Sequence, residues 1–423
     1  MTTAPDPTSW LARSSHPLHT LSADAPTTDL QPLRDVLDGV RIVGLGEATH
    51  GTREFFRLKH RLLAFLVREL GYSTFAMEAS ESAAPAVDAY VRHGIGSAAE
   101  AVAGLGFWTW RTREVLAMVE WMRTYNNGRP ESAQVRFLGI DPQKCGPSLA
   151  ALAATPDRLP APERSRAATL LTALRTLDGA QPGSRPDPGQ RLVREAEELV
   201  RLLEPHGSDT LRHARNLVRA ADLVTRPWQH TDPEQTLFAV RDRHMADALE
   251  AELAAAPAAK TVLWAHNGHI GKARHGGAIR TLGHHLHDRH GHAYYALALL
   301  FGSGAFRAHR TLPGPWRGPR ARTRNAPVPT HPIGPPEADT VEAQLAGATP
   351  GDHFLDLRSA PDAVREWADT PHPHRSYGAM VPRWSYRLHR TPVVLNESYD
   401  GLAYVATSSP SEPFTVPLAV GRG

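Results

Sequence analysis

The chain has 423 residues and a formal net charge of only +3, with 47 Lys and Arg against 44 Asp and Glu. No basic run with interleaved aromatic residues marks a nucleic-acid face. The single cysteine, Cys145, excludes an internal disulfide and a cysteine-based zinc site. No apolar stretch approaches the roughly 20 residues that span a bilayer, and the N-terminus lacks a signal-peptide pattern. We therefore expect a cytoplasmic protein with no nucleic-acid or membrane partner.

The order of predicted elements along the chain indicates an α/β fold. Residues 1–28, rich in Pro, Ser and Thr, are expected to form a flexible N-terminal segment, and residues 29–423 a single domain. Apolar strand-like runs alternate with helical segments in that domain, as in parallel sheets. We expect strands at 41–46, 72–79, 135–140, 260–265 and 293–301, and helices around them at 30–37, 54–70, 83–93, 111–125 and 278–290.

The region between the third and fourth strands is different in character. Its helical segments at 192–203, 211–224 and 233–254 indicate a helical insertion over about residues 155–255. Two stretches, 179–190 and 311–338, are rich in Pro, Gly or Arg and are expected to be surface loops that influence specificity. We predict a central, largely parallel sheet flanked by helices, with an inserted helical subdomain and a deep active-site cleft.

Polar, titratable residues follow four of the predicted strands at the point where each strand ends. The first strand, in the segment RIVGLGEATHG at 41–51, stops at glycine and is followed by a carboxylate and an imidazole three residues apart. Because ligands bind beyond the carboxyl ends of strands in open α/β sheets, we expect these side chains to converge on one pocket. The six residues are Glu47, His50, Glu78, Asp141, His266 and His269.

These residue types favour general-base chemistry. No Gly-x-Ser-x-Gly elbow precedes the histidines, and the lone cysteine has no base partner, so an acyl-enzyme is not favoured. A histidine whose ring N–H binds a carboxylate suits the activation of water. We expect Glu47, His50, Glu78, His266 and His269 to be catalytic. Candidates to hold the substrate or stabilise an oxyanion are Lys59, Arg61, Arg111, Arg113, Asp141 and Asn267.

A metal site is the alternative use of the same histidines. His266 and His269, with His50 and a glutamate, offer ligands for zinc or manganese. However, the sequence His-Asn-Gly-His directly after a strand is expected to be a loop, where glycine leaves the ligand geometry undefined. We therefore predict no metal ligands and no cofactor.

Six motifs in chain order resemble the erythromycin esterase family. They are GEATHGTREFFRLKHRL, FAMEAS, WTWRTREVLAMVEWMRTYN, FLGIDPQ, RDRHMADAL and VLWAHNGHIG, and they extend over residues 40 to 300 or so. The resemblance implies an α/β fold with a deep cleft and an added helical portion. It also implies metal-independent hydrolysis of macrolide lactones, with His50 as the base that activates water. A basic position that is often arginine in relatives is Lys59 here, and a lysine cannot grip an oxyanion bidentately.

Three functional hypotheses remain open at this stage. The first is a hydrolase of a cyclic ester, with a polyketide-like natural product as its small-molecule partner. The second is a tailoring enzyme in natural-product biosynthesis that uses the same residues for cyclisation, ring opening or elimination without hydrolysis. The third, implied by distant relatives of the fold, is a haem- or metal-binding protein.

Overall fold

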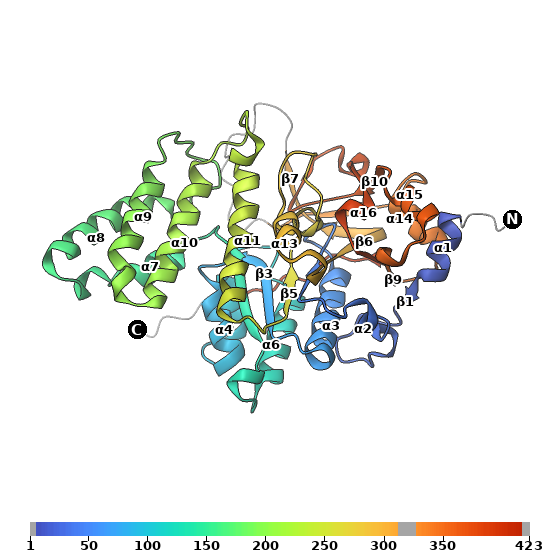
Figure 1. Ribbon diagram of the computed structural model, residues 1–423, viewed down its shortest axis with the longest axis horizontal. Coiled ribbons are helices and arrows are strands. Elements are labelled where there is room, and N and C mark those ends of the chain that lie inside the picture. The colour runs from blue at the N-terminus through green and yellow to red at the C-terminus, as the bar shows by residue number, and fades with distance from the viewer. Residues whose placement is uncertain (1–5, 312–326, 417–423) are drawn as a thin grey trace.

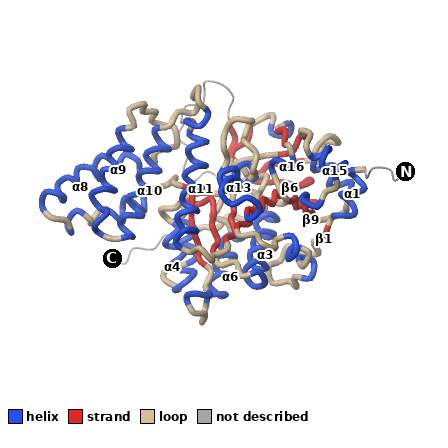
Figure 2. Tube along the Cα trace, in the orientation of Figure 1, coloured by secondary structure: helices blue, strands red, loops and turns tan. Residues whose placement is uncertain are grey.

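A nine-stranded sheet forms the centre of the molecule in the computed structural model, which describes residues 6–311 and 327–416 (Figures 1 and 2). Eight of its strands follow the order β1-β9-β13-β6-β2-β5-β3-β4, and β8 pairs with β6 outside this path. The strands are β1 (His16–Pro17), β2 (Ile42–Leu45), β3 (Thr74–Ser80), β4 (Arg136–Asp141), β5 (Thr261–Trp264), β6 (Tyr294–Arg307), β8 (Thr330–Ile333), β9 (His353–Asp356) and β13 (Gly401–Ser408).

Neighbouring strands from β13 to β4 pair in parallel, whereas β1, β8 and β9 pair antiparallel. The prediction of a largely parallel sheet flanked by helices is confirmed. Every residue of β2 and β5 is buried, as expected for strands covered on both faces. Two small sheets lie outside the main one and pair β7 (His309–Thr311) with β11 (Met380–Pro382) and β10 (His372–Arg375) with β12 (Arg390–Val393).

Helices cover the sheet and begin and end at recognisable signals. For example, α3 ends at Gly71, which has a positive φ of 73° that suits glycine, and α6 begins at Thr112, whose side chain accepts the Val115 N–H. The helices of the sheet-bearing body are α1 (Pro7–Ser14), α2 (Leu33–Val36), α3 (Arg53–Leu70), α4 (Ala84–His93), α5 (Ala98–Gly104), α6 (Arg113–Asn126), α12 (Asn267–Ile270), α13 (Leu282–His290), α14 (Val341–Ala348), α15 (Asp362–Ala368) and α16 (Leu395–Ser398).

Five helices between β4 and β5 form the region that the sequence predicts as a helical insertion. They are α7 (Gly146–Leu152), α8 (Ala161–Leu174), α9 (Arg191–Leu203), α10 (Ser208–Thr225) and α11 (Leu237–Ala255). In Figure 1, α8 to α10 project to the left of the sheet, and α11 runs between them and the strands. Helices α7 to α10 enclose a separate hydrophobic cluster that includes Leu152, Leu170, Leu199 and Leu217. This subdomain therefore has a core of its own.

The N-terminal segment differs from the prediction of a flexible stretch over 1–28. Asp6 caps α1 by accepting the Ser9 N–H, and Trp10, Leu11 and Leu18 are buried in the main core. Burial of these three apolar side chains holds the segment against the body. Residues 1–5 lie outside the described residues.

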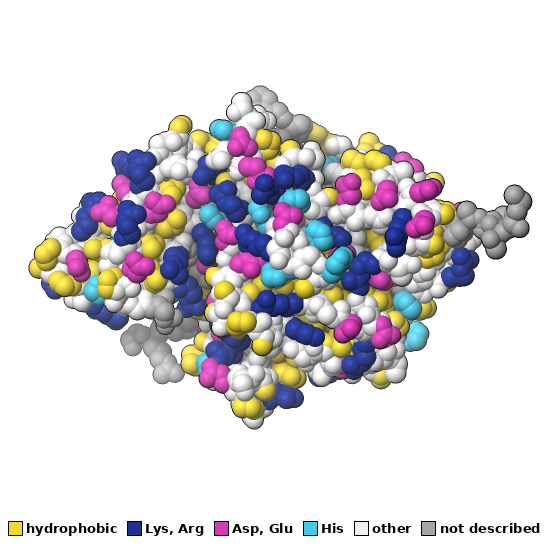
Figure 3. All heavy atoms as spheres, viewed as in Figure 1, with side chains coloured by type: hydrophobic (Ala, Val, Ile, Leu, Met, Phe, Trp, Pro, Cys, Tyr) yellow, Lys and Arg dark blue, Asp and Glu magenta, His cyan; other side chains and the backbone are white. Residues whose placement is uncertain are grey.

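The predicted loop at 311–338 lies partly outside the described residues, which exclude 312–326. Within its described part, Thr330–Ile333 forms β8 and pairs with β6. Among the described helices, none is both long and apolar enough to cross a membrane. On the face drawn in Figure 3, basic and acidic side chains are interspersed over the helices.

Candidate active site

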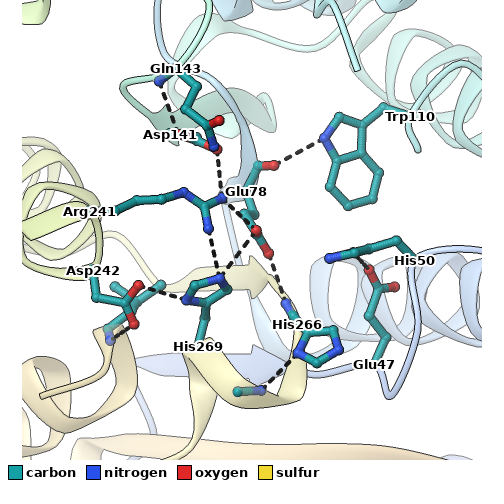
Figure 4. A network of polar contacts seen from close by, with 12 residues as sticks. Glu47, His50, Glu78, Trp110, Asp141, Gln143, Arg241, Asp242, His266 and His269 are labelled. Atoms are coloured by element: carbon teal, nitrogen blue, oxygen red, sulfur yellow. Dashed lines mark hydrogen bonds and ion pairs between the residues drawn. The ribbon is translucent and has the colours of Figure 1, made fainter. Parts of the chain in front are cut away.

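The ends of β2, β3, β4 and β5 bring the six predicted residues to one edge of the sheet (Figure 4). These strands are neighbours in the order β2-β5-β3-β4, so their carboxyl ends lie side by side. Residues far apart in the sequence therefore meet here. A cavity of about 740 Å³ beside Trp121 and Tyr125 lies elsewhere, between α3 and α6. The deep cleft expected over the strand ends stays a prediction.

His50 is paired with a carboxylate through one ring nitrogen. Its Nδ1 lies 2.6 Å from Glu47 Oε1, and only 8% of His50 is exposed. Its Nε2 has no hydrogen-bond partner among the described residues. The ring stands edge-on to Trp110 at 5.6 Å and lies 5.0 Å from the ring of His266. The arrangement leaves one nitrogen available for proton transfer.

Glu47 is held by two further side chains on its second oxygen. Oε2 accepts hydrogen bonds from Lys59 Nζ at 2.9 Å and from Trp264 Nε1 at 3.1 Å, and all three residues are fully buried. Lys59 also lies 4.4 Å from the Trp264 ring centroid. Burial lowers the pKa of Lys59 to about 8, although Glu47 opposes the shift. Lys59 thus serves as the counter-ion of Glu47.

Both carboxylate oxygens of Glu78 have partners within the protein. Oε1 accepts from Arg241 Nη2 at 2.7 Å and faces His269 Nε2 at 3.4 Å, while Oε2 accepts the His266 backbone N–H at 2.9 Å. Burial alone would raise its pKa, but His269 and Arg241 hold the pKa of Glu78 well below its usual range. Glu78 is therefore an ionised group that positions its neighbours.

Arg241, from α11, is the central residue that the sequence analysis did not single out. Its Nη2 donates to both Glu78 and Asp141 at 2.7 Å, and its Nη1 lies 2.9 Å from His269 Nε2. The guanidinium thus joins the carboxylates of Glu78 and Asp141. Within the described part of the chain, no group of three or more His, Cys, Asp or Glu is placed to hold a metal.

His269 lies between two carboxylates. Its Nδ1 is 2.7 Å from Asp242 Oδ1, the residue after Arg241 on α11. Burial opposes protonation, but Asp242 and Glu78 raise the pKa of His269 to about 10, against the effect of Arg241 as well. The ring therefore keeps a proton on Nδ1 facing Asp242. The motif RDRHMADAL contains both Arg241 and Asp242, and an Arg-Asp pair within this predicted helix is the signal that would have found them.

His266 has both ring nitrogens engaged. Nδ1 accepts the Gly268 N–H at 3.1 Å, which caps α12, and Nε2 donates to the Tyr377 carbonyl at 3.2 Å. Burial and the neighbouring His50 lower the pKa of His266 to about 3. The ring is therefore neutral and fixed in one tautomer. The expectation of a loop at this position is wrong, because this cap starts a short helix.

The remaining predicted residues have different positions. Asn267 is buried and joins α12 to β6 by binding the backbone N–H and carbonyl of Leu299. Arg61 does not face the strand ends, because its guanidinium binds Asp29 and the Pro26 carbonyl and so anchors the N-terminal segment. Arg111 and Arg113 are exposed at the start of α6.

The model of the erythromycin esterase family matches residues 67–408, which is most of the chain. The protein belongs to the erythromycin esterase family, and the resemblance given by the motifs is confirmed. The matched range begins after Glu47 and His50, so these two residues lie outside it. Membership of an esterase family supports an enzyme of the hydrolase class.

Individual relatives are distant. The chain is 32% identical to erythromycin esterase type II of Escherichia coli over an alignment of 139 residues. This alignment covers 33% of this chain and 32% of that protein. The chain is 23% identical to a putative hydrolase of Bacillus subtilis, and this alignment covers 95% of this chain and 91% of that protein.

Solved structures share the fold over nearly the full length. A succinoglycan biosynthesis protein has a TM-score of 0.79 at 22% identity and covers 96% of this chain and 97% of its own. A variant of the erythromycin esterase EreC in its open conformation has a TM-score of 0.69 at 18% identity. The match covers 95% of this chain and 100% of the EreC chain. At these identities the likeness supports the fold class.

Proposed function

We propose that the protein hydrolyses an ester bond in a small molecule, a macrolide-like lactone, with His50 as the general base. One observation carries this proposal. Of the three histidines at the strand ends, His266 and His269 have their ring nitrogens engaged by the protein, whereas His50 Nε2 has no partner among the described residues. His50 is therefore the group able to accept a proton from water.

The proposed reaction follows from that geometry. His50 Nε2 takes a proton from a water molecule, whose oxygen forms a bond to the ester carbonyl carbon. Glu47, bound to Nδ1, fixes the tautomer and stabilises the imidazolium that forms. The tetrahedral intermediate then breaks its bond to the alkoxide, which receives the proton from His50. Lys59 and Trp264 keep Glu47 oriented during this cycle.

Glu78, Arg241, His266 and His269 act in this proposal as positioning residues. Their mutual contacts hold the start of α12 against the end of β3. The same contacts disfavour a haem- or metal-binding role, because the donor atoms of His266 and His269 are already taken by protein partners.

The test is hydrolysis of a macrolide lactone, or of an activated ester if no lactone is cleaved, by the full chain and by His50→Asn. We expect the substitution to lower kcat by about 10²–10⁴, the usual contribution of a general base. His93→Asn, at an exposed position on α4, is the matched control. In oxygen-18 water the product acid should carry the label.

Activity of His50→Asn close to that of the control would overturn the role of His50. Turnover without label would instead indicate the non-hydrolytic tailoring chemistry, which uses the same base. These two readouts separate the identity of the base from the type of reaction.

A further inference from the structure

Three cations lie in or beside the segment 107–111, which is part of the loop from α5 to α6 and carries Trp110 against His50. They are Lys144, Arg111 and Arg307, and none forms an ion pair with a carboxylate of the described residues. Lys144 and Arg111 are exposed, whereas Arg307 is buried. The buried Lys59 and the half-buried Arg241, by contrast, are paired with Glu47 and Glu78. Arg307 is therefore the one of the three whose lack of a carboxylate partner needs an explanation.

Arg307, at the end of β6, is the least expected of the three. Only 8% of Arg307 is exposed, and its buried Nη1 nevertheless has no hydrogen-bond partner in the described structure. Its guanidinium lies 5.4 Å from the ring centroid of Trp108. A buried charge without a partner is costly unless a ligand supplies one.

The nearby carboxylate of Glu114 does not fill this role. Glu114 interacts electrostatically with Arg307. However, Glu114 Oε1 lies 3.6 Å from Arg53 and also accepts the Glu412 backbone N–H. Arg111, another cation close to Arg307, adds to the positive charge. The two guanidiniums thus leave a net positive region beside Trp108.

Lys144 bounds the opposite end of the loop. Its Nζ lies 5.8 Å from the Phe107 ring centroid, and its backbone has a φ of 64°. This left-handed conformation costs a non-glycine residue about 1–2 kcal/mol, and strained residues of this kind cluster at functional sites. Lys144 directly follows Gln143, which binds Asp141 at the end of β4.

The loop and its cations adjoin the proposed base. The Arg307 backbone N–H donates to the carbonyl of Gly51, the residue after His50, at 3.1 Å. Trp110, two residues after Trp108, contacts the His50 ring. The backbone of Arg307 and the loop that carries Trp108 therefore both lie next to the segment that carries His50.

We propose that Phe107, Trp108, Arg111, Lys144 and Arg307 form a subsite for an anionic group of the substrate, a carboxylate or a phosphate. A guanidinium binds either group through two parallel hydrogen bonds, and the half-buried rings of Phe107 and Trp108 contact its apolar neighbour. This inference rests on the proposed esterase function and narrows its substrate class to acidic esters.

Two matched esters test it with the full chain. Mono-4-nitrophenyl glutarate carries a free carboxylate, and methyl 4-nitrophenyl glutarate carries none. We expect kcat/KM to favour the acidic ester by about tenfold or more at low salt, as a charge-assisted hydrogen bond allows, and 0.5 M NaCl to reduce this preference. Arg307→Gln and Lys144→Gln should lower the preference, mainly through KM for the acidic ester, and Arg307→Lys should retain part of it.

Arg13→Gln is the control, because it removes the same charge at an exposed position on α1. It should keep the wild-type preference. Equal preference in Arg307→Gln and Arg13→Gln, or no preference in the wild type, overturns the subsite. If Arg307→Gln fails to fold by thermal melting, Lys144→Gln and Arg111→Gln, both at exposed positions, decide the question.

Calorimetric titration with glutarate and with inorganic phosphate separates the two proposals. If neither ester is cleaved but glutarate binds the wild type at least about tenfold more tightly than Arg307→Gln, the esterase proposal fails and the anion subsite stands. Binding of phosphate alone, without glutarate binding or ester preference, identifies an adventitious ion only and overturns the subsite.

Discussion

The carboxylate of Glu47 connects the base to a buried lysine, and this contact sets a pH limit on the site. Lys59 is charged below pH 8, because burial lowers its pKa to about 8. Above that pH the lysine loses its proton, and Glu47 loses the cation that balances and orients it. The pairing of Glu47 with His50 is weakened as a result.

We therefore expect kcat/KM of the wild type to fall above about pH 8. In Lys59→Arg the decline should move to higher pH, since a guanidinium stays protonated in proteins. The measurement is a pH–rate profile from pH 6 to 10, corrected for the uncatalysed reaction. Identical alkaline limbs in the two proteins would show that Lys59 does not control the reaction.

The strand-end residues were predictable because parallel strands bring their carboxyl ends to one edge of the sheet. The position of a carboxylate or histidine that follows each strand can therefore be inferred from the sequence. Arg241 was not predictable, because two of its partners, Glu78 and Asp141, lie 163 and 100 residues away. For the same reason Arg61 was assigned to the substrate, whereas it binds Asp29. Helical position alone does not distinguish it from Lys59, two residues earlier on α3.

At the scale of elements, close backbone packing places the loop that carries His50. Gly51 lies against the end of β6, where a Cβ atom would come within 2.0 Å of the Arg307 carbonyl oxygen and 2.6 Å of its nitrogen. Both are backbone atoms of a sheet strand, so neither moves easily. The loop therefore fits against β6 only with glycine at this position.

Gly51→Ala should destabilise the protein by about 3 kcal/mol, the upper part of the range for overpacking. Gly347→Ala is the matched control, since no atom lies within 4 Å of its Cβ position in α14. That substitution should stabilise the protein by about 0.5–1 kcal/mol. Urea denaturation of both variants measures the difference, and an equal effect of the two would contradict the contact.

Long, apolar or strongly periodic elements such as α3 and β3 follow their predicted ranges to within a few residues. Several short helices were missed, and α1 and α12 show the local reasons. Polar composition hid α1, whose Asp6 cap and buried Trp10 hold it in place, and glycine hid α12, which begins at the His266 cap. Short elements depend on capping contacts that composition does not reveal.

At the scale of the whole molecule, neutral histidines that are buried or half-buried make the fold sensitive to acid. His60, on α3, packs edge-on against Trp121, and burial lowers its pKa from 6.5 to about 4. Because the unfolded chain takes up the proton first as pH falls, stability is lost progressively between pH 6.5 and 4. His374 has its pKa lowered to about 4 for the same reason and acts in the same direction.

Between pH 7 and 5, His60 alone should cost the wild type about 2 kcal/mol of unfolding free energy by this linkage. His60→Phe should therefore lose less stability over this interval, whereas His292→Gln, at an exposed position, should behave as the wild type. Urea denaturation at pH 7 and pH 5 compares the three proteins. An equal loss in His60→Phe and the wild type would contradict the assignment.

Helix α11 links the helical subdomain to the chemistry. It packs against α10 on one side and β4 on the other, and it carries Arg241 and Asp242 into the polar network. A substitution in the core of α7 to α10 that tilts α11 slightly would leave secondary structure intact. It would nevertheless separate the Arg241 guanidinium from the carboxylates of Glu78 and Asp141. Loss of turnover in a well-folded variant altered far from His50 is thus an expected phenotype of this architecture.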